Sequence, residues 1–283
     1  MTGAVQMRLP DSLNYEVSGD RRSPAVLFLH GFMGSSADWG EVMAALGDRA
    51  LCIAIDLPGH GVSLGLSTEA YTIEGCARAV VNTLNRLEVE HAVVVGYSMG
   101  GRLALYLALR HPERCAGLFL ESASPGLKSA SERAARRAAD ESKAKRLETG
   151  DFEAFLRDWY RQPLFASLAR DEELLRRTVQ ARRSNDPVEL ARSLRGMGTG
   201  SQQSLWGELG GLGVPVLAVA GGLDEKYVRA SSRMAGINPL IRLAVVPEAG
   251  HSVHAERPAA YVSLLGGFMD RLSLGLGEAE PVP

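Results

Sequence analysis

The chain has 283 residues, of which 46% are hydrophobic and 23% charged, and its formal net charge is −2 at pH 7. This length and composition fit one α/β domain with an insertion better than two independent domains. The near-neutral charge gives no support to nucleic-acid binding. No apolar run approaches membrane-spanning length, and the first residues lack the basic and apolar segments of a signal peptide.

The three cysteines, Cys52, Cys76 and Cys115, are scattered and odd in number, with no C-x-x-C spacing. This usage is typical of reduced, buried thiols, so we expect a cytoplasmic protein without membrane insertion. A small-molecule substrate is the expected partner, and the protein is expected to act as a monomer or a small homo-oligomer.

In the first 124 residues, short β-like runs alternate with helical patterns. Apolar runs at 25–29, 51–55 and 93–95 predict buried strands, and helical periodicity covers 73–87 and 102–110. This alternation predicts βαβ units and a mainly parallel sheet flanked by helices.

The strand pattern disappears between residues 127 and 206. This region is rich in Ala, Arg, Glu and Leu, and it predicts helices that include 131–147, 151–160 and 171–182. A wholly helical insertion between two α/β portions is best explained as a cap over the carboxyl edge of the sheet, where ligands bind in open α/β sheets.

From Val214 the alternation resumes, with predicted strands at 214–220 and 243–246 and a last helix at 258–272. The polar residues after that helix contain proline and glycine and predict a loose tail. The predicted organisation is an α/β core of residues 1–124 and 207–272, a helical cap of residues 125–206 and a tail of residues 273–283.

The most informative stretch is Gly96-Tyr97-Ser98-Met99-Gly100, which lies between the apolar run 92–95 and the helical pattern 102–109. A G-x-S-x-G between a buried strand and a helix is typical of a nucleophile elbow. The small residues let strand and helix approach closely, and the serine occupies a strained turn that exposes its oxygen. The alternative is an ordinary turn with a chance serine, and the flanking pattern favours the elbow.

Candidates for an acid and a base follow the serine in the order that this architecture uses. Asp224 comes directly after the predicted strand 214–220, and His251 lies in a glycine-containing loop after the strand 243–246. In this arrangement His251 takes the proton of Ser98, and Asp224 binds the other ring nitrogen and fixes the tautomer.

Both positions have a competitor. His254 lies three residues after His251, and Glu121 ends the predicted strand 117–120. His254 is expected to begin the following helix, and the two histidines lack a third ligand with metal-site spacing. Asp224 is preferred to Glu121 because it lies one strand before the histidine, where this architecture keeps its acid.

An oxyanion hole is also predicted. His30-Gly31-Phe32 follows the buried strand 25–29 directly. In such enzymes one backbone N–H comes from this early loop and a second from the residue after the nucleophile. The candidate donors are therefore the amides of Phe32 and Met99, aimed at a developing negative charge.

The near-neutral total charge hides an asymmetry. The segment from Pro125 to Leu205 carries 16 Lys plus Arg and 12 Asp plus Glu, a balance of +4, whereas the remainder has a balance of −6. Positive charge concentrated in the predicted cap suggests that this segment meets an anion. The alternative is a solvated helical surface, which is the expected state for most of these arginines.

Several motifs carry a specific resemblance. They are Leu29–Phe32, Asp56–Gly61, Gly96–Arg102, Pro125–Leu127 followed by Arg133 and Arg136, Asp158–Pro163 and Arg183–Asn185. Together they resemble the α/β-hydrolase superfamily and, within it, the 2-succinyl-6-hydroxy-2,4-cyclohexadiene-1-carboxylate synthase family, called MenH. The first two motifs discriminate little, whereas Arg102 and the cap motifs are narrower. The resemblance covers roughly Leu27 to Arg271.

This resemblance implies a lyase of menaquinone biosynthesis rather than a hydrolase. The family eliminates pyruvate from 2-succinyl-5-enolpyruvyl-6-hydroxy-3-cyclohexene-1-carboxylate, and no cofactor or metal is implied. Ser98, Asp224 and His251 match the family's triad, in which the serine, activated by histidine, removes a carbon-bound proton.

The same resemblance extends to the substrate pocket. Arg102, Arg136 and Arg183 match the family's carboxylate-binding arginines, and Tyr97 and Trp159 match its pocket residues. A substrate with three carboxylates needs cationic partners, and the planar fork of arginine binds carboxylates in a bidentate manner.

Three alternatives stay open at this point. The cap motifs align loosely, so Arg133 or Arg182 could take the role of its neighbouring arginine. The triad would equally serve a serine hydrolase acting on esters or on carbon–carbon bonds of diketones, and only the cap arginines favour the lyase. A ligand-binding relative with little turnover is the third alternative, against which the presence of Ser98 and His251 argues.

Overall fold

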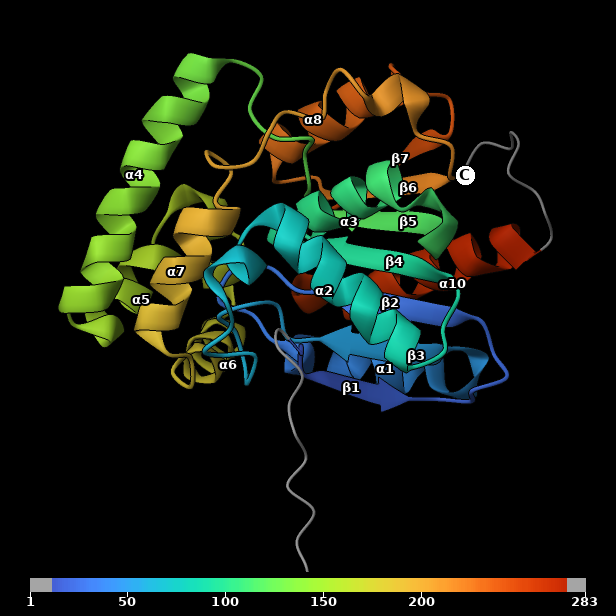
Figure 1. Ribbon diagram of the computed structural model, residues 1–283, viewed down its shortest axis with the longest axis horizontal. Helices are drawn as coiled ribbons and strands as arrows, with labels where there is room; N and C mark the ends of the chain where they lie inside the picture. The colour runs from blue at the N-terminus through green and yellow to red at the C-terminus, as the bar shows by residue number, and fades with distance from the viewer. Residues whose placement is uncertain (1–11, 274–283) are drawn as a thin grey trace, which may run out of the picture.

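Seven short apolar segments form one sheet in the computed structural model, which describes residues 12–273 (Figure 1). The strand order is β1-β3-β2-β4-β5-β6-β7, with β1 antiparallel to β3 and every other neighbouring pair parallel. The predicted, mainly parallel sheet is thereby confirmed. The strands are β1 (Tyr15–Ser18), β2 (Ala25–Leu29), β3 (Leu51–Ile55), β4 (Ala92–Tyr97), β5 (Cys115–Glu121), β6 (Val216–Gly221) and β7 (Ile241–Val246).

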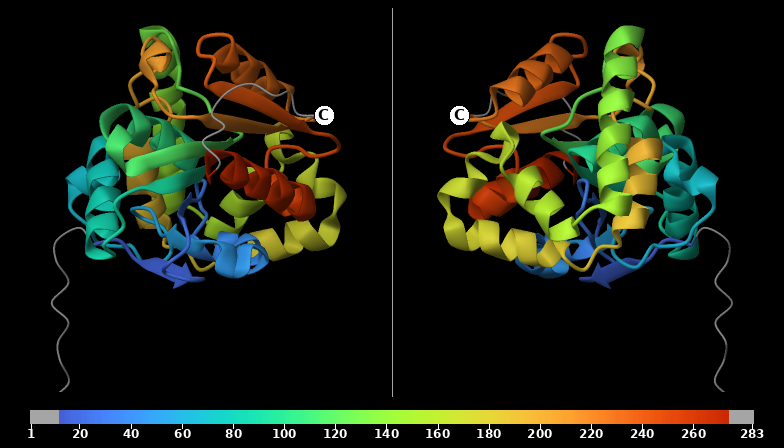
Figure 2. Two further views of the ribbon diagram at one scale, coloured as in Figure 1. Left: turned by 90° about the vertical axis from the view of Figure 1, so that its right-hand side faces the viewer. Right: turned by 90° about the vertical axis from the view of Figure 1, so that its left-hand side faces the viewer.

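Helices cover both faces of this sheet, because its inner strands are apolar on both sides. One face packs against α2, α3 and α8, and the other against α1 and α10, as the side views show (Figure 2). These helices, with the short α9, are α1 (Gly40–Leu46), α2 (Ile73–Arg86), α3 (Met99–Arg110), α8 (Glu225–Ala235), α9 (Val253–Glu256) and α10 (Pro258–Ser273). Among residues 12–273, no helix has the length and apolar character to cross a membrane.

The register of the parallel strands brings their carboxyl ends to one edge of the sheet. Tyr97 at the end of β4 pairs with Glu121 at the end of β5, which in turn pairs with Val219 of β6. Segments that follow β4, β5, β6 and β7 therefore meet at this edge although they are far apart in sequence. Open α/β sheets bind their ligands at such an edge.

Four helices lie between β5 and β6 in the chain and gather at one end of the strands (Figure 1). They are α4 (Ala130–Thr149), α5 (Phe152–Tyr160), α6 (Glu172–Arg182) and α7 (Pro187–Met197). The division of the chain into core and cap at residues 125 and 206 stays a prediction. Of the predicted tail, residues 274–283 lie outside the described residues.

Seven 3₁₀ helices complete the secondary structure of the described part of the chain. They are Ser36–Trp39, Gly47–Arg49, Thr68–Tyr71, Pro112–Arg114, Pro163–Phe165, Leu168–Arg170 and Leu209–Gly211.

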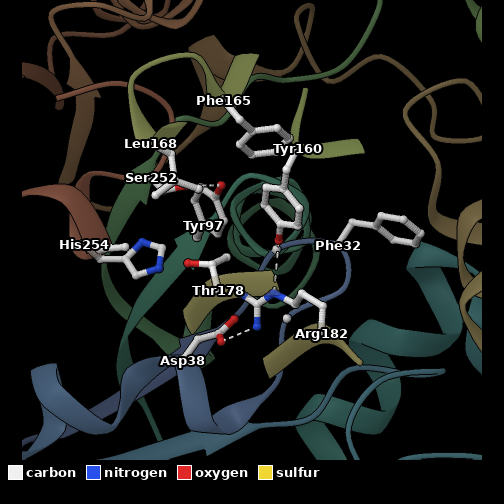
Figure 3. Close-up of a pocket in the computed structure, with 13 residues that line it drawn as sticks. Phe32, Asp38, Tyr97, Tyr160, Phe165, Leu168, Thr178, Arg182, Ser252 and His254 are labelled. Carbon is white, nitrogen blue, oxygen red and sulfur yellow. Dashed lines mark hydrogen bonds and ion pairs between the residues drawn. The ribbon is translucent and has the colours of Figure 1, made fainter. Parts of the chain in front are cut away.

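A buried ion pair ties these four helices to the rest of the molecule. Arg182, the last residue of α6, donates from Nη1 to Asp38 Oδ1 at 2.5 Å and from Nε to the Tyr160 hydroxyl at 3.2 Å (Figure 3). The side chains of Arg182 and Asp38 are only 11% and 12% exposed. Asn185 adds a second link by donating to the backbone oxygen of Met33 at 2.9 Å.

Breaking this ion pair leaves the Arg182 charge buried without its carboxylate. We expect Asp38→Ala to lower the free energy of unfolding by about 3 kcal/mol, because an uncompensated buried charge is strongly destabilising. The exposed pair of Arg176 and Glu173 supplies the control: Arg176→Ala is expected to cost less than about 1 kcal/mol. Urea denaturation of the three proteins checks this, and equal losses in the two variants would contradict it.

Candidate active site

Ser98 stands on a sharp turn between β4 and α3. Its backbone has φ 50° and ψ −100°, a left-handed conformation that non-glycine residues rarely adopt. The turn is tight because a Cβ on Gly100 would lie 2.0 Å from the Leu29 backbone oxygen, and one on Gly96 would lie 2.6 Å from that of Gly100. Only glycine fits at both positions, as the nucleophile-elbow pattern requires.

The structure brings Ser98, His251 and Asp224 together. His251 Nε2 lies 3.2 Å from Ser98 Oγ, and His251 Nδ1 lies 2.7 Å from Asp224 Oδ2. Because a carboxylate only accepts, Nδ1 carries the ring proton and Nε2 is free to accept the proton of the serine. His251 is 2% exposed, so this geometry is shielded from water.

Asp224 is held in place by its second role. It is the N-cap of α8, and its Oδ1 accepts from the Tyr227 backbone N–H at 3.4 Å while Oδ2 faces His251. Rings of Tyr227 and Phe165 lie against the His251 imidazole, with centroids at 4.8 Å and 6.0 Å. The carboxylate and the imidazole are therefore both fixed by their neighbours.

The two competitors from the sequence, Glu121 and His254, pair with each other. His254 Nδ1 lies 2.8 Å from Glu121 Oε2, and the His254 backbone N–H donates to Glu121 Oε1 at 3.1 Å. Burial by itself lowers the pKa of His254, but the charge and hydrogen bond of Glu121 raise it above its ordinary value. Figure 3 shows His254 beside the small cavity that Asp38 and Arg182 also line. Glu121 and His254, the alternatives to Asp224 and His251, are therefore bound to each other.

The predicted oxyanion donors lie on either side of the elbow, and both residues line the pocket that contains Ser98. The Met99 amide belongs to the first turn of α3, where N–H groups have no partner within the helix. The Phe32 amide shares its peptide with the Gly31 carbonyl, which accepts from His30 Nδ1 at 2.7 Å. His30 Nε2 in turn accepts from the Leu57 backbone N–H at 2.9 Å. Since the C=O and N–H of a trans peptide point in opposite directions, His30 fixes the direction of the Phe32 N–H.

The pocket at Ser98 has a volume of about 610 Å³ and opens between the sheet edge and the helices α4, α5 and α7. Tyr97 and Trp159, both predicted pocket residues, line it. Trp159 is held by the ring of Phe32 at 5.2 Å between centroids, and Tyr97 donates or accepts a hydrogen bond with Ser252 at 2.8 Å. Among residues 12–273, no group of three His, Cys, Asp or Glu could hold a metal ion.

Arg102 enters this pocket from α3 and is 8% exposed. Its guanidinium donates to Gln202 Oε1 at 2.7 Å and to the Met197 backbone oxygen at 2.8 Å, both of them neutral acceptors. Burial lowers the pKa of Arg102 to about 10, so the group still carries its charge at neutral pH. A buried cation that faces a pocket and has only neutral acceptors is a ready anion site.

Arg136 also lines the pocket, but it shares its charge with Asp140, whose Oδ1 accepts from Arg136 Nε at 2.7 Å. Lys143, one helical turn farther along α4 from Asp140, lines the same pocket. Sequence reasoning missed Lys143, although its spacing from Arg136 along a predicted helix would have placed it on the same face.

The structure does not bring Arg183 to this pocket, contrary to the sequence-based expectation. Arg183 directly follows α6, its side chain is 48% exposed, and it pairs with Glu153 of α5 at 2.9 Å on the exterior. The two alternative arginines do not replace it. Arg182 is held by Asp38, and Arg133 donates to the backbone oxygens of Leu127 and Lys128.

Comparison with known proteins first gives the class. Residues 24–258 match the family model described as alpha/beta hydrolase fold, which agrees with the sheet order and the elbow. A solved structure of MenH from S. aureus has a TM-score of 0.88 and 32% sequence identity, covering 92% of this chain and 98% of that one.

Comparisons of sequence identify the family within this class. The 2-succinyl-6-hydroxy-2,4-cyclohexadiene-1-carboxylate synthase of Escherichia coli O1:K1 is 33% identical over 246 residues, which cover 87% of this chain and 94% of the relative. A Bacillus subtilis protein to which the same name is given provisionally is 37% identical over 271 residues. These residues cover 94% of this chain and 98% of the relative. The chain belongs to the 2-succinyl-6-hydroxy-2,4-cyclohexadiene-1-carboxylate synthase family.

The Glu121–His254 pair makes part of the stability depend on pH. Because the folded-state pKa of His254 is raised, the pair contributes fully below the ordinary histidine pKa of about 6.5, and this contribution is lost as the pH rises through the folded pKa. The difference in free energy of unfolding between wild type and Glu121→Gln is therefore expected to be larger at about pH 6 than at about pH 9. Urea titrations at both pH values test this, and a difference that grows with pH would count against it.

Proposed function

We propose that this chain eliminates pyruvate from 2-succinyl-5-enolpyruvyl-6-hydroxy-3-cyclohexene-1-carboxylate to give 2-succinyl-6-hydroxy-2,4-cyclohexadiene-1-carboxylate, a step of menaquinone biosynthesis. Family membership supports this reaction over the others that the same fold carries out. The observation that carries the proposal is the environment of Arg102. Its buried guanidinium faces the pocket beside Ser98, and it donates to two neutral oxygens, Gln202 Oε1 and the Met197 backbone oxygen.

Compensation of charge links Arg102 to a substrate of this kind. A buried cation without a counter-charge is costly, and a protein keeps one where a ligand supplies the missing anion. The substrate carries three carboxylates, and guanidinium binds carboxylate with two parallel hydrogen bonds. Arg102 is assigned the carboxylate nearest to the reacting ring carbon, and Arg136 a second one. Tyr97 and Trp159 are assigned the walls against which the ring packs.

In the proposed reaction, His251 accepts the proton of Ser98 Oγ, and the serine oxygen removes the ring proton at the carbon that bears the succinyl group. The electron pair left on that carbon moves through the ring double bond, and the bond between the ring and the enolpyruvyl oxygen breaks. Pyruvate leaves as its enolate, which takes up a proton, while His251 gives up the proton that it accepted, so that the three residues return to their starting protonation states. Asp224 stabilises the imidazolium that forms during the transfer.

The oxyanion hole has a task in this scheme. The ring proton is α to the succinyl carbonyl, so its removal places negative charge on that carbonyl oxygen. The N–H groups of Phe32 and Met99 are proposed to bind this enolate oxygen, in the way that such donors bind the oxyanion in acyl transfer. Proton transfer and loss of the enolpyruvyl oxygen require no redox step, so the proposal includes no cofactor.

A cytoplasmic location is part of the same proposal. The free cysteines Cys52, Cys76 and Cys115 are all buried, and burial raises the pKa of Cys52 to about 11. Unreactive, unpaired thiols suit a reducing compartment. The oligomeric state is proposed to be a monomer or a small homo-oligomer.

Removal of the serine hydroxyl tests the proposed base. We expect Ser98→Ala to lower kcat for pyruvate release by about 10³-fold or more, with the substrate dissociation constant within a few-fold of wild type. Ser122→Ala, which removes a buried serine at the end of the neighbouring strand, serves as the matched control and should retain activity. Full turnover in Ser98→Ala would refute the role given to the serine. Ester cleavage without pyruvate release in the wild type would instead favour the hydrolase alternative.

Replacement of Arg102 tests the anion site. Arg102→Gln is expected to raise KM by about 10- to 100-fold with a smaller effect on kcat, because a charged hydrogen bond to the substrate is lost. Arg183→Ala is expected to leave KM within about twofold, since its guanidinium pairs with Glu153 on the exterior. Steady-state pyruvate release measures both variants. A reversed pattern would restore the sequence-based assignment of Arg183 and remove that of Arg102.

A further inference from the structure

One face of α4 carries a row of charged side chains along the pocket. Arg136, Asp140 and Lys143 follow one another at spacings of four and three residues, which place them on the same side of a helix. Arg136 and Lys143 both line the pocket that contains Ser98. Asp140 is buried and holds Arg136.

Lys143 differs from its neighbours on α4, Lys145 and Arg146, in having no counter-ion. Across residues 12–273, its ammonium forms no ion pair, hydrogen bond or cation–π contact, although the residue is half-buried. Its neighbour Lys145 is 71% exposed and lies 3.9 Å from Glu141. Arg146 pairs with Asp158 at 2.6 Å. The positive charge of Lys143 is thus left for the pocket, whereas those of Lys145 and Arg146 are neutralised on the outside of the helix.

The carboxylates at the pocket do not neutralise Lys143 either. Asp224 is engaged by His251, and Glu225 pairs with Arg229 at 2.9 Å. Seven residues of α-helix span about 10 Å, so the ammonium of Lys143 attaches about two turns along α4 from Arg136. Lys226 also lines the pocket, with its ammonium 5.2 Å from the centroid of the Tyr227 ring. Lys143 therefore offers a cationic position that is separate from Arg102 and Arg136 and is not engaged by any neighbour among the described residues.

We propose that Lys143 binds the terminal carboxylate of the succinyl arm and selects substrates that carry this third negative charge. This inference rests on the proposed function. A carbonyl and two methylenes separate that carboxylate from the ring, so it reaches farther from the reacting carbon than a carboxylate attached to the ring itself. An ammonium on a flexible four-carbon stem suits such a mobile group, whereas the rigid forks of Arg102 and Arg136 suit carboxylates held close to the ring.

The experiment compares two substrates on four proteins by steady-state pyruvate release. The substrates are the natural trianion and its analogue with the succinyl carboxylate replaced by a carboxamide. The proteins are the wild type, Lys143→Ala, the conservative Lys143→Arg and the control Lys145→Ala, which removes an exposed ammonium from the outer face of the same helix. Thermal unfolding confirms that each variant is folded.

For the natural substrate, Lys143→Ala is expected to raise KM by about fivefold to tenfold with kcat within about twofold, whereas Lys143→Arg and Lys145→Ala stay near wild type. With the carboxamide, the KM of the wild type is expected to be higher than its KM for the natural substrate by a similar factor. The KM of Lys143→Ala for the carboxamide is expected to be no higher than that of the wild type, because the two changes remove the same contact. This non-additivity separates direct binding from a general effect of charge on the pocket.

The other outcomes contradict either the role of Lys143 alone or the proposed function as well. Equal KM values for wild type and Lys143→Ala on the natural substrate overturn the role of Lys143 while the proposed function stands. If the increases in KM caused by Lys143→Ala and by the carboxamide are additive, Lys143 acts through the overall electrostatic field of the pocket and does not contact the succinyl carboxylate. A folded wild type that releases no pyruvate refutes the proposed function, and the inference that rests on it falls with it.

Discussion

The close approach of α3 to the end of β2 is the constraint on which the site depends. Gly100 lies so near the Leu29 backbone oxygen that a single methyl group would push the helix away from the sheet. Ser98, which directly precedes this helix, adopts a positive φ of 50°, and Met99 lines the same pocket as Phe32. Ser98, Met99 and Arg102, one turn farther along α3, are thus all positioned by one contact between backbones.

The carboxyl edge of the sheet holds two histidine–carboxylate pairs, and the ring of Tyr97 lies against both histidines. Its centroid is 5.4 Å from that of His251 and 4.8 Å from that of His254. The pair of Asp224 and His251 contacts Ser98 through His251. The buried pair of Glu121 and His254 links the segment after β7 to the end of β5. The second pair therefore stabilises the segment that presents His251, which gives a structural reason for two similar residues so close in sequence.

The positions of the charged side chains in the helices α4–α7 matter more for the pocket than their net charge. Most of the arginines are neutralised by neighbours on the exterior, as Arg183 is by Glu153 and Arg195 by Glu141. Arg102 and Lys143, in contrast, face the pocket without a carboxylate in the described part of the chain. Specificity for a polycarboxylate would follow from these uncompensated charges, because paired surface ions contribute little to binding an external anion.

Apolar periodicity and glycine spacing are local properties of the chain, so the amino-acid sequence alone predicts the parallel sheet, the elbow at Ser98 and the order in which Asp224 and His251 follow it. It also contained the positive excess between β5 and β6. The pairing of Glu121 with His254, the outward position of Arg183 and the place of Lys143 at the pocket become visible only in the folded chain. The physical reason is that a charged side chain's partner is set by packing between elements far apart in sequence, and no local pattern encodes which neighbour it meets.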